Sequence, residues 1–380
     1  MQNKFTEVAN KITTIKTGFA EAISAKGVET APNATFSDMI ANVGSITGGG
    51  GGAVVYDDWT KPHDWPDIEA DPLESKEMAR MLFCDRFNDT PEELTFISSQ
   101  FSMGTIDWGD GTEPTKFSSS SYPGRTVKHT FDTNGGVYCE SLGCKVYIVK
   151  VTFDSNNIPF MEIGKNSATY QQSLESGLLW FYGVIGPASF TSLFNSMYSN
   201  ARLCQRIHIT NQISRAYPVK GLFYNLHSLV SLKYNYALEG KDEIRDLFTN
   251  CFSLRKAPAI STASSTGSYS NNRYHFRGCH SLMEIGTITL ASNIRFEIGD
   301  SSCKPPVKKI DFAYDSSKAP VFTETVPIKI NYTQLDKAAL DKLMTQLPDG
   351  NGKTLDIQYN PGSTTCDTSI ATAKNWTVLV

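Results

Sequence analysis

The chain has 380 residues, of which 40% are apolar and 19% charged, and its formal net charge is −4. This is the composition of an ordinary soluble protein of two or three domains, without a run of roughly 18 apolar residues for a membrane span or the apolar core of a secretory signal. We therefore expect no membrane insertion and no export through a standard signal route, and the negative charge argues against a nucleic-acid partner.

Residues 1–47 are predicted to form a small helical module. Apolar residues recur at intervals of mostly three and four between positions 3 and 25, and Thr35 can cap a second, shorter helix. The order of a helix, KGV, a proline-containing turn and TFSDMIANVGSI resembles the N-terminal module of many phage tail and fibre proteins. The resemblance implies attachment to other virion proteins or to copies of this chain, whereas the alternative is a helical hairpin packed on its own chain. The residues expected to make the attachment are Phe5, Val8, Ile12, Ile15, Phe19, Phe36, Met39 and Ile40.

A flexible joint is expected next, because five consecutive glycines at 48–52 cannot hold a helix or a strand. We assign residues 48–78 to this linker and to the acidic, aromatic segment that follows it. The tryptophans and prolines of that segment, Trp59 and Trp65 among them, favour an irregular run laid over a neighbouring surface. No function is predicted for it.

Residues 79–154 are predicted to form strands and turns. In TIDWGDGT at 105–112, Gly109 and Gly111 permit a tight turn at positive φ, and Asp110 can accept hydrogen bonds from the amides of the turn. Together with HTF at 129–131 and KVYIVKVTF at 145–153, this motif resembles the polycystic-kidney-disease (PKD) type of immunoglobulin-like β-sandwich. The resemblance implies that Trp108 and Phe131 fill the core of the sandwich.

The same motif contains two acids that could hold calcium, Asp107 and Asp110. Two carboxylates fall far short of the six or more oxygen ligands that calcium takes, so we predict no metal site. We expect His129 to close a structural hydrogen bond rather than to act in catalysis.

Residues 155–325 contain a repeat. One phrase starts at Tyr198, Phe223, Phe248 and Phe276, at spacings of 25, 25 and 28 residues, with an aromatic residue first, Asn or Gly third and Leu or Cys seventh. Such a period lies in the leucine-rich-repeat range, in which each unit supplies a strand and a turn and must stack on its neighbours to bury its apolar face. The pattern F-x-N-C-x-S-L resembles the degenerate leucine-rich repeats of BspA-like surface proteins, which bacterial adhesins share with phage tail proteins.

The cysteines and histidines are explained by repeat positions. The eight cysteines form no zinc pattern, and Cys251 and Cys279 share one repeat position, so we expect small buried side chains. Cys139 and Cys144 could bridge a hairpin, and the sequence leaves open whether they pair. His227 and His280 also share a repeat position.

Motifs for nucleophilic, phosphate-binding or zinc chemistry do not occur, and we therefore predict no catalytic residue, cofactor or enzymatic activity.

Residues 326–380 are predicted to form a terminal cap. A strand at 327–330, an amphipathic helix at 332–347, a strand TLDIQY, a short helix and a last strand follow one another. The ending IATAKNWTV resembles the end of phage proteins that carry these repeats. Such a cap would protect the last edge of the stack.

The predicted fold class is multidomain and mainly β. It comprises the N-terminal helical module, a PKD/Ig-like β-sandwich and a BspA-like leucine-rich-repeat solenoid with an α/β C-terminal cap. The resemblances imply a bacteriophage virion structural protein, a tail fibre or adhesin, assembled in the host cytoplasm as a homo-oligomer such as a trimer. It would attach by residues 1–47 and bind a host surface glycan or protein through its repeat loops.

The loop residues expected to be exposed for that contact are Tyr234, Tyr236, Tyr269, Asn271, Asn272, Arg273 and Tyr274. The alternative is that these tyrosines cover neighbouring repeats or another subunit. Three alternatives remain open at this point. They are a purely structural head-fibre, collar or decoration protein, a bacterial surface adhesin, and a polysaccharide-cleaving tail enzyme. The host, the receptor and the place on the particle are not predicted.

Overall fold

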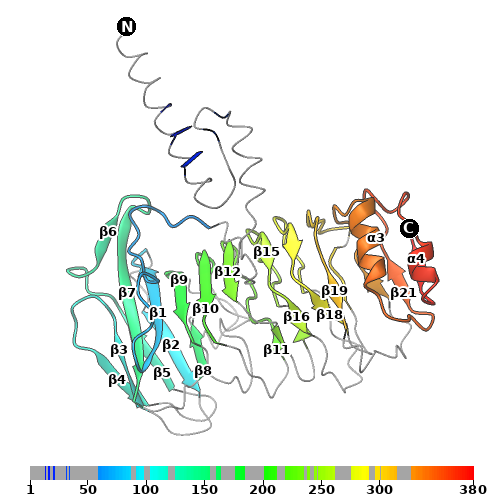
Figure 1. Ribbon diagram of the computed structural model, residues 1–380. Coiled ribbons are helices and arrows are strands. Elements are labelled where there is room, and N and C mark those ends of the chain that lie inside the picture. The colour runs from blue at the N-terminus through cyan, green and yellow to red at the C-terminus, as the bar shows by residue number, and fades with distance from the viewer. Residues whose placement is uncertain are drawn as a thin grey trace. The chain divides into compact units, whose positions relative to one another are not determined.

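A computed structural model gives the fold of the chain in two compact units, residues 1–56 and 57–380 (Figure 1). The residues it describes are 13, 16, 17, 20, 21, 31, 34, 59–86, 91–97, 103–118, 125–154, 160–163, 176–184, 201–211, 219–234, 238–239, 244–245, 247–261, 275–290, 296–299, 301–314 and 327–380. In the first unit, the described residues 13, 16, 17, 20 and 21 are helical. All eight residues expected to make the virion attachment lie outside the described residues, so that role stays a prediction.

The second unit begins with two layers of antiparallel strands. The first layer contains β1 (Glu77–Cys84), β3 (Met103–Asp107), β4 (Thr115–Ser118), β6 (Val137–Cys139) and β7 (Cys144–Phe153). The second contains β2 (Glu92–Ile97), β5 (Arg125–His129) and β8 (Phe160–Ile163). The ring of Phe96 stacks on Phe117 at 4.0 Å and lies 5.8 Å from Phe153, so aromatic side chains join the two layers. Trp108 and Phe131 are buried in the same core, as expected.

The first layer continues into the repeats without a break. β9 (Leu178–Gly183) pairs antiparallel with β1, β10 (Arg206–Ile209) pairs parallel with β9, and β12 (Ser231–Tyr234) pairs parallel with β10 (Figure 1). All eight residues of β1 are buried, as is usual for a strand with neighbours on both sides and cover on both faces. One hydrophobic core therefore extends from the first layers into the repeats.

The chain is mainly β with few helices, and residues 180–379 form a β-solenoid-like region of about five turns. Its short strands pair in parallel from one turn to the next. They are β11 (Val219–Lys220), β13 (Leu238–Glu239), β14 (Ile244–Arg245), β15 (Lys256–Ala257), β16 (Ile260–Ser261), β17 (Glu284–Ile285), β18 (Ile288–Thr289) and β19 (Phe312–Ala313). The prediction that successive repeats stack is confirmed.

The repeat motif forms the interior of each turn. The rings of Phe223 and Phe248 stack at 5.1 Å and those of Phe248 and Phe276 at 5.6 Å, all fully buried. The third position of the motif takes a positive φ, which is 63° at Asn250 and 80° at Gly278. Asn and Gly recur there because they tolerate this left-handed conformation better than other residues.

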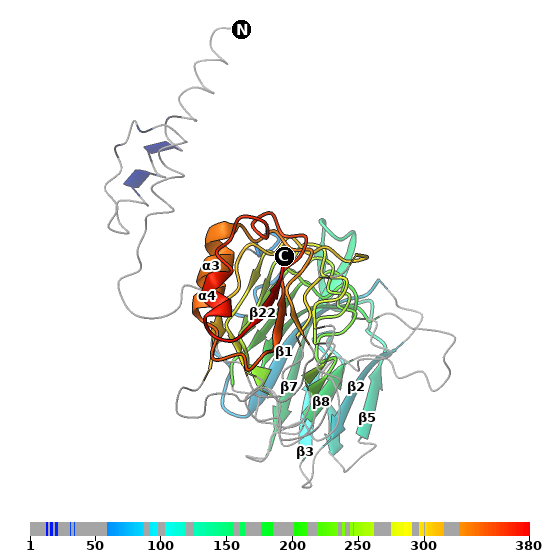
Figure 2. The ribbon, with the colours of Figure 1, turned by 90° about the vertical axis from the view of Figure 1, so that its right-hand side faces the viewer.

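The C-terminal elements follow the predicted order. They are β20 (Ile328–Lys329), α3 (Lys337–Thr345), β21 (Thr354–Asp356), α4 (Ser369–Thr372) and β22 (Thr377–Leu379). The predicted start of the first helix was wrong, because Tyr332 takes a φ of 55° and the carboxylate of Asp336 caps the helix by accepting from the amide of Ala339 at 2.8 Å. In Figure 2, α3 and α4 lie together beside β22.

This C-terminal segment continues the stack of parallel strands. β20, β21 and β22 pair in parallel, and Glu297 forms a parallel bridge with Lys329. Within the described part of the chain, β22 pairs with β21 on one side, and Leu379 is 43% exposed. The C-terminal segment pairs onto the repeat stack at residues 296–298, and its protection of the last edge of the repeats stays a prediction.

Candidate functional site

Residues 59–75 lie across the outer surface of β1, β9 and β10. The guanidinium of Arg80 on β1 donates to the carbonyl oxygens of Asp71 at 2.8 Å and Pro72 at 3.0 Å. Trp65 and Ile68 are buried against side chains of the sheet. The expectation of an irregular segment laid over a neighbouring surface is confirmed, and we call residues 59–75 the strap.

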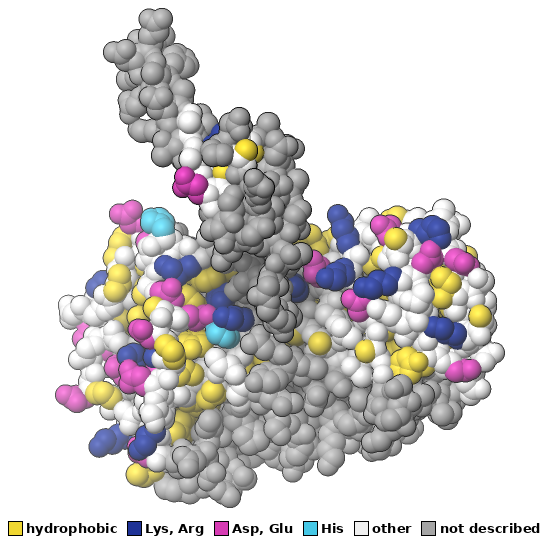
Figure 3. All heavy atoms as spheres, in the orientation of Figure 1, with side chains coloured by type: hydrophobic (Ala, Val, Ile, Leu, Met, Phe, Trp, Pro, Cys, Tyr) yellow, Lys and Arg dark blue, Asp and Glu magenta, His cyan; other side chains and the backbone are white. Residues whose placement is uncertain are grey.

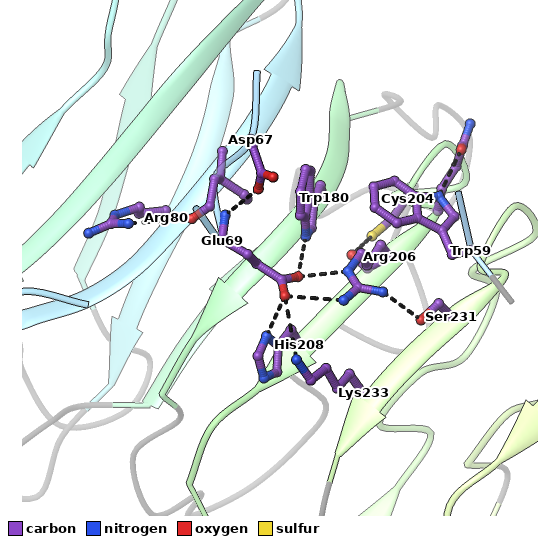
Figure 4. A network of polar contacts seen from close by, with 12 residues as sticks. Trp59, Asp67, Glu69, Arg80, Trp180, Cys204, Arg206, His208, Ser231 and Lys233 are labelled. Carbon is purple, nitrogen blue, oxygen red and sulfur yellow. Dashed lines mark hydrogen bonds and ion pairs between the residues drawn. The ribbon is translucent and has the colours of Figure 1, made fainter. Parts of the chain in front are cut away.

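A network of charged groups holds the strap at Glu69 (Figure 4). One carboxylate oxygen of Glu69 accepts from Nε1 of Trp180 at 2.9 Å and from Nε of Arg206 at 2.7 Å. The other accepts from Nη2 of Arg206 at 3.1 Å and from Nδ1 of His208 at 2.7 Å, and Nζ of Lys233 lies 3.9 Å away. Three successive strands, β9, β10 and β12, thus converge on one carboxylate of the strap.

Aromatic rings enclose the guanidinium of this network. The Arg206 guanidinium carbon lies 4.9 Å from the ring centre of Trp59 and 5.9 Å from that of Trp180, within the range of cation–π attraction. The remaining amine of Arg206, Nη1, donates to the hydroxyl of Ser231 at 3.1 Å. Arg206 is therefore buried with its charge paired and its donors directed at acceptors.

The low pKa of Glu69 is typical of a carboxylate held in an ion pair and not of a group that transfers protons near neutral pH. Burial raises the pKa of Glu69, but the hydrogen bonds and charges of His208 and Arg206 more than offset this effect and lower the pKa to about 2. A general acid or base near neutral pH needs a pKa close to the working pH. The network therefore fastens the strap to the sheet.

A second cluster surrounds Asp110 in the WGDGT turn. One oxygen of Asp110 accepts from the ring of His129 at 2.6 Å, and the other accepts from the hydroxyl of Thr112 at 2.6 Å. Burial raises the pKa of Asp110, yet these hydrogen bonds and one from the amide of Asp132 bring it below its usual value. The His129 ring stacks on Trp108 at 4.4 Å. The predicted hydrogen bond of His129 is confirmed.

The carboxylates of Asp107 and Asp110 accept hydrogen bonds from different groups. The carboxylate of Asp107 accepts from the amide of Gly109 at 2.9 Å and so closes the turn locally. Among the described residues, no group of three or more His, Cys, Asp and Glu is placed to hold a metal.

The eight cysteines are free thiols, including Cys139 and Cys144, which face each other across the β6–β7 pair. In the solenoid, the thiol of Cys251 lies 2.9 Å from the carbonyl oxygen of Phe223, and that of Cys279 lies 3.0 Å from the carbonyl oxygen of Phe248. Both thiols are fully buried, and burial raises their pKa. The prediction of small buried side chains at this repeat position is confirmed.

The predicted binding loops are described at one position. Tyr234 pairs with Ile209 in the parallel ladder of β10 and β12, points into the core and is 6% exposed, so the expectation of an exposed loop residue is wrong there. Tyr236, Tyr269, Asn271, Asn272, Arg273 and Tyr274 lie outside the described residues. Their contact with a ligand stays a prediction.

An exposed row of rings lies along the turns of the solenoid. The ring of Phe252 stacks on His227 at 4.4 Å and lies 5.8 Å from His280, and its side chain is 38% exposed. The shared repeat position of the two histidines is confirmed, because Phe252 occupies the same position in the turn between them. The sequence contained this signal, since the three residues follow Leu226, Cys251 and Cys279 directly.

Comparison of the chain with protein-family models, curated proteins and solved structures found no match. A search of the described helices found none that is both long enough and apolar enough to cross a membrane.

Proposed function

We propose that this chain is a bacteriophage virion structural protein, a tail fibre or adhesin that binds the host surface through its repeats. The observation that carries the proposal is the stacked spine of Phe223, Phe248 and Phe276. A solenoid with such a spine offers a long surface whose loops vary without disturbing the core. Such a surface suits binding rather than turnover.

The finer fold assignments belong to the same proposal. The first two layers of the second unit are a PKD/Ig-like sandwich, supported by the WGDGT turn and by the burial of Trp108 and Phe131. The solenoid turns are BspA-like leucine-rich repeats, supported by the aromatic spine and by the left-handed Asn or Gly of each motif. Residues 1–47 are the virion attachment module, supported by their sequence resemblance alone.

The strap supports the idea of a rigid display element on a flexible connection. The polyglycine run ends at Gly52, and from Trp59 onward the chain is held on the sheet, where the Trp59 and Trp180 rings lie 4.8 Å apart. The strap therefore joins the chain to β9 and β10 near the first turn of the solenoid. The proposed partners are virion proteins for residues 1–47 and a host glycan or protein for the repeats, with the chain assembled as a homo-oligomer such as a trimer.

The proposal is tested by labelling the full chain and measuring its binding to a panel of bacterial strains and its ability to block plaque formation. We expect saturable binding to a subset of strains, and antibodies against the chain should label phage particles that infect them. A variant lacking residues 1–52, checked for folding by circular dichroism, should still bind cells but no longer be incorporated into particles.

The alternatives give different results in the same experiment. Labelled particles without binding to cells would indicate a head-fibre, collar or decoration protein. Detection of the chain on uninfected cells, with none on particles, would indicate a bacterial surface adhesin. Shortening of capsule chains on incubation would indicate an enzyme and would contradict the proposal.

A further inference from the structure

Three columns of residues run along one side of the solenoid, which we call the repeat edge; its members Arg206 and Ser231 are buried, at 6% and 7% exposure. Each residue of the first column directly follows one buried residue of its turn, namely Ala201, Leu226, Cys251, Cys279 or Cys303. The second and third columns are the two residues that come after a later buried residue of the same turn, namely Cys204, Leu229, Leu254, Leu282 or Val307. The first column is Arg202, His227, Phe252, His280 and Lys304. The second is Gln205, Val230, Arg255, Met283 and Lys308, and the third is Arg206, Ser231, Lys256, Glu284 and Lys309.

Backbone pairing holds these columns in register from turn to turn. Arg206 pairs with Ser231, Lys256 with Glu284, and Glu284 with Lys309. The amide of Met283 donates to the carbonyl oxygen of Arg255, and the amide of Lys308 to that of Met283, each at 2.8 Å. Neighbouring strands lie about 4.8 Å apart, so each column is a row of side chains with that spacing.

The repeat edge is strongly basic although the chain as a whole carries a net charge of −4. Its basic members are Arg202, Arg206, Arg255, Lys256, Lys304, Lys308 and Lys309, and its one carboxylate is Glu284. Glu284 lies 3.7 Å from Nζ of Lys256 and 3.9 Å from that of Lys309, and Arg206 is engaged by Glu69 of the strap. In Figure 3, Lys and Arg side chains lie among Asp and Glu side chains on the part of the second unit that holds the solenoid and the C-terminal elements. The exposed bases therefore outnumber the carboxylate beside them, which favours a polyanionic partner.

Apolar side chains are exposed among these bases. Phe252 is 38% and Met283 36% exposed, in turns that follow each other. The Phe252 ring stacks on His227 and is tilted by 33° to the ring of His280, so it lies between these two rings. Phe252 and Met283 therefore offer apolar contact to the C–H groups of sugar rings held beside the bases. A phosphate polymer without sugar rings would leave the apolar contacts unused.

We propose that the repeat edge binds an acidic polysaccharide with carboxylate-bearing sugars, lying along the stacking direction of the solenoid. Arg255, Lys308 and Lys309 pair with carboxylates of the polysaccharide, while Phe252 and Met283 contact the sugar rings. This inference rests on the proposed function, since it names the class of host glycan that the repeats bind.

The test uses the full chain and four probes, namely polygalacturonate, neutral dextran, oligothymidylate and inorganic polyphosphate, in a surface-binding assay at several salt concentrations. We expect tightest binding to polygalacturonate, weakening as salt rises, because exposed charge contacts are screened. The variant Arg255→Gln with Lys308→Gln should bind it about tenfold or more weakly. The control Lys116→Gln with Lys128→Gln removes the same charge from β4 and β5 and should bind as the unaltered chain does.

Three results would overturn the inference. These are equal binding of dextran, tighter binding of oligothymidylate or polyphosphate, or unchanged affinity of the Arg255 and Lys308 variant at an unaltered melting temperature. Cell binding separates the two proposals. If the Arg255→Gln, Lys308→Gln variant still binds cells fully, the proposed function stands and the repeat edge is not the site that binds the cell. If the chain binds polygalacturonate through the edge but no bacterial strain, the edge stands and the proposed function fails.

Discussion

Asn250 donates a hydrogen bond of 2.8 Å from its side-chain amide to the side-chain oxygen of Asn225, one turn earlier in the solenoid. Both residues hold a left-handed φ, 63° and 62°, and the next turn has Gly278 at the same position. The residue at the third position of the motif therefore adopts a left-handed backbone conformation within its turn and forms a hydrogen bond to the neighbouring turn. Substitutions at Asn250 can separate the contributions of the conformation and of the hydrogen bond to stability.

Asn250→Ala should lower the free energy of unfolding by about 2 kcal/mol, because it loses the hydrogen bond and because alanine tolerates a positive φ less well than asparagine does. Asn250→Gly loses the hydrogen bond alone and should cost about 1 kcal/mol. Urea unfolding of the full chain measures both. Equal costs for the two variants would show that the conformation contributes nothing at this position.

His275→Leu is expected to stabilise the protein. His275 is fully buried, and within the described residues neither ring nitrogen has a hydrogen-bond partner. The equivalent positions of the two preceding turns are Leu222 and Leu247, both fully buried. Removing a buried polar group without a partner should raise the free energy of unfolding by about 1–2 kcal/mol at pH 7.5. The reverse change in the same column, Leu247→His, is the control and should destabilise. A loss of stability in His275→Leu would contradict the assignment of an unpartnered ring.

Acid should destabilise the protein between about pH 6.5 and 4, with His275 as one cause. Burial lowers the pKa of His275 from 6.5 to about 4, so in this range the unfolded chain binds a proton that the folded chain does not. Stability therefore falls as the pH falls, by up to about 3 kcal/mol from this group. Melting curves across this range should show a shallower slope for His275→Leu than for the unaltered chain. Identical slopes would exclude His275 as a source of the acid sensitivity.

Glu69→Gln should loosen the strap at neutral pH. The folded pKa of Glu69 is lowered from 4.5 to about 2, so its stabilisation is fully present above about pH 4.5 and is lost as the pH falls toward 2. The glutamine variant removes that charge at every pH, and hydrogen exchange of the strap amides should become faster. Asp67→Asn changes an exposed carboxylate that accepts from the amide of Glu69 at 2.9 Å, and it should leave the other strap amides nearly unchanged. Equal exchange in the two variants would show that the Glu69 charge does not hold the strap.

The sequence by itself determined the features that recur or that lie close together along the chain. The spacing of Phe223, Phe248 and Phe276 required a stacked spine, because a unit of about 25 residues cannot bury its apolar face alone. The glycines of WGDGT and the Asn or Gly of the repeat showed where the backbone turns. The basic columns of the repeat edge were also present in the sequence, but their register became visible only through strand pairing.

The tertiary structure alone decided which distant segments meet. The pairing of β1 with β9 merges the first layers with the solenoid, and Glu69 reaches Arg206 and His208 from 137 and 139 residues away. The tertiary structure also decided that Tyr234 points inward, because its pairing with Ile209 fixes which face of the sheet its side chain lies on. Contacts of this kind leave no periodic trace in the sequence, because each depends on a single pairing that forms only when the chain has folded.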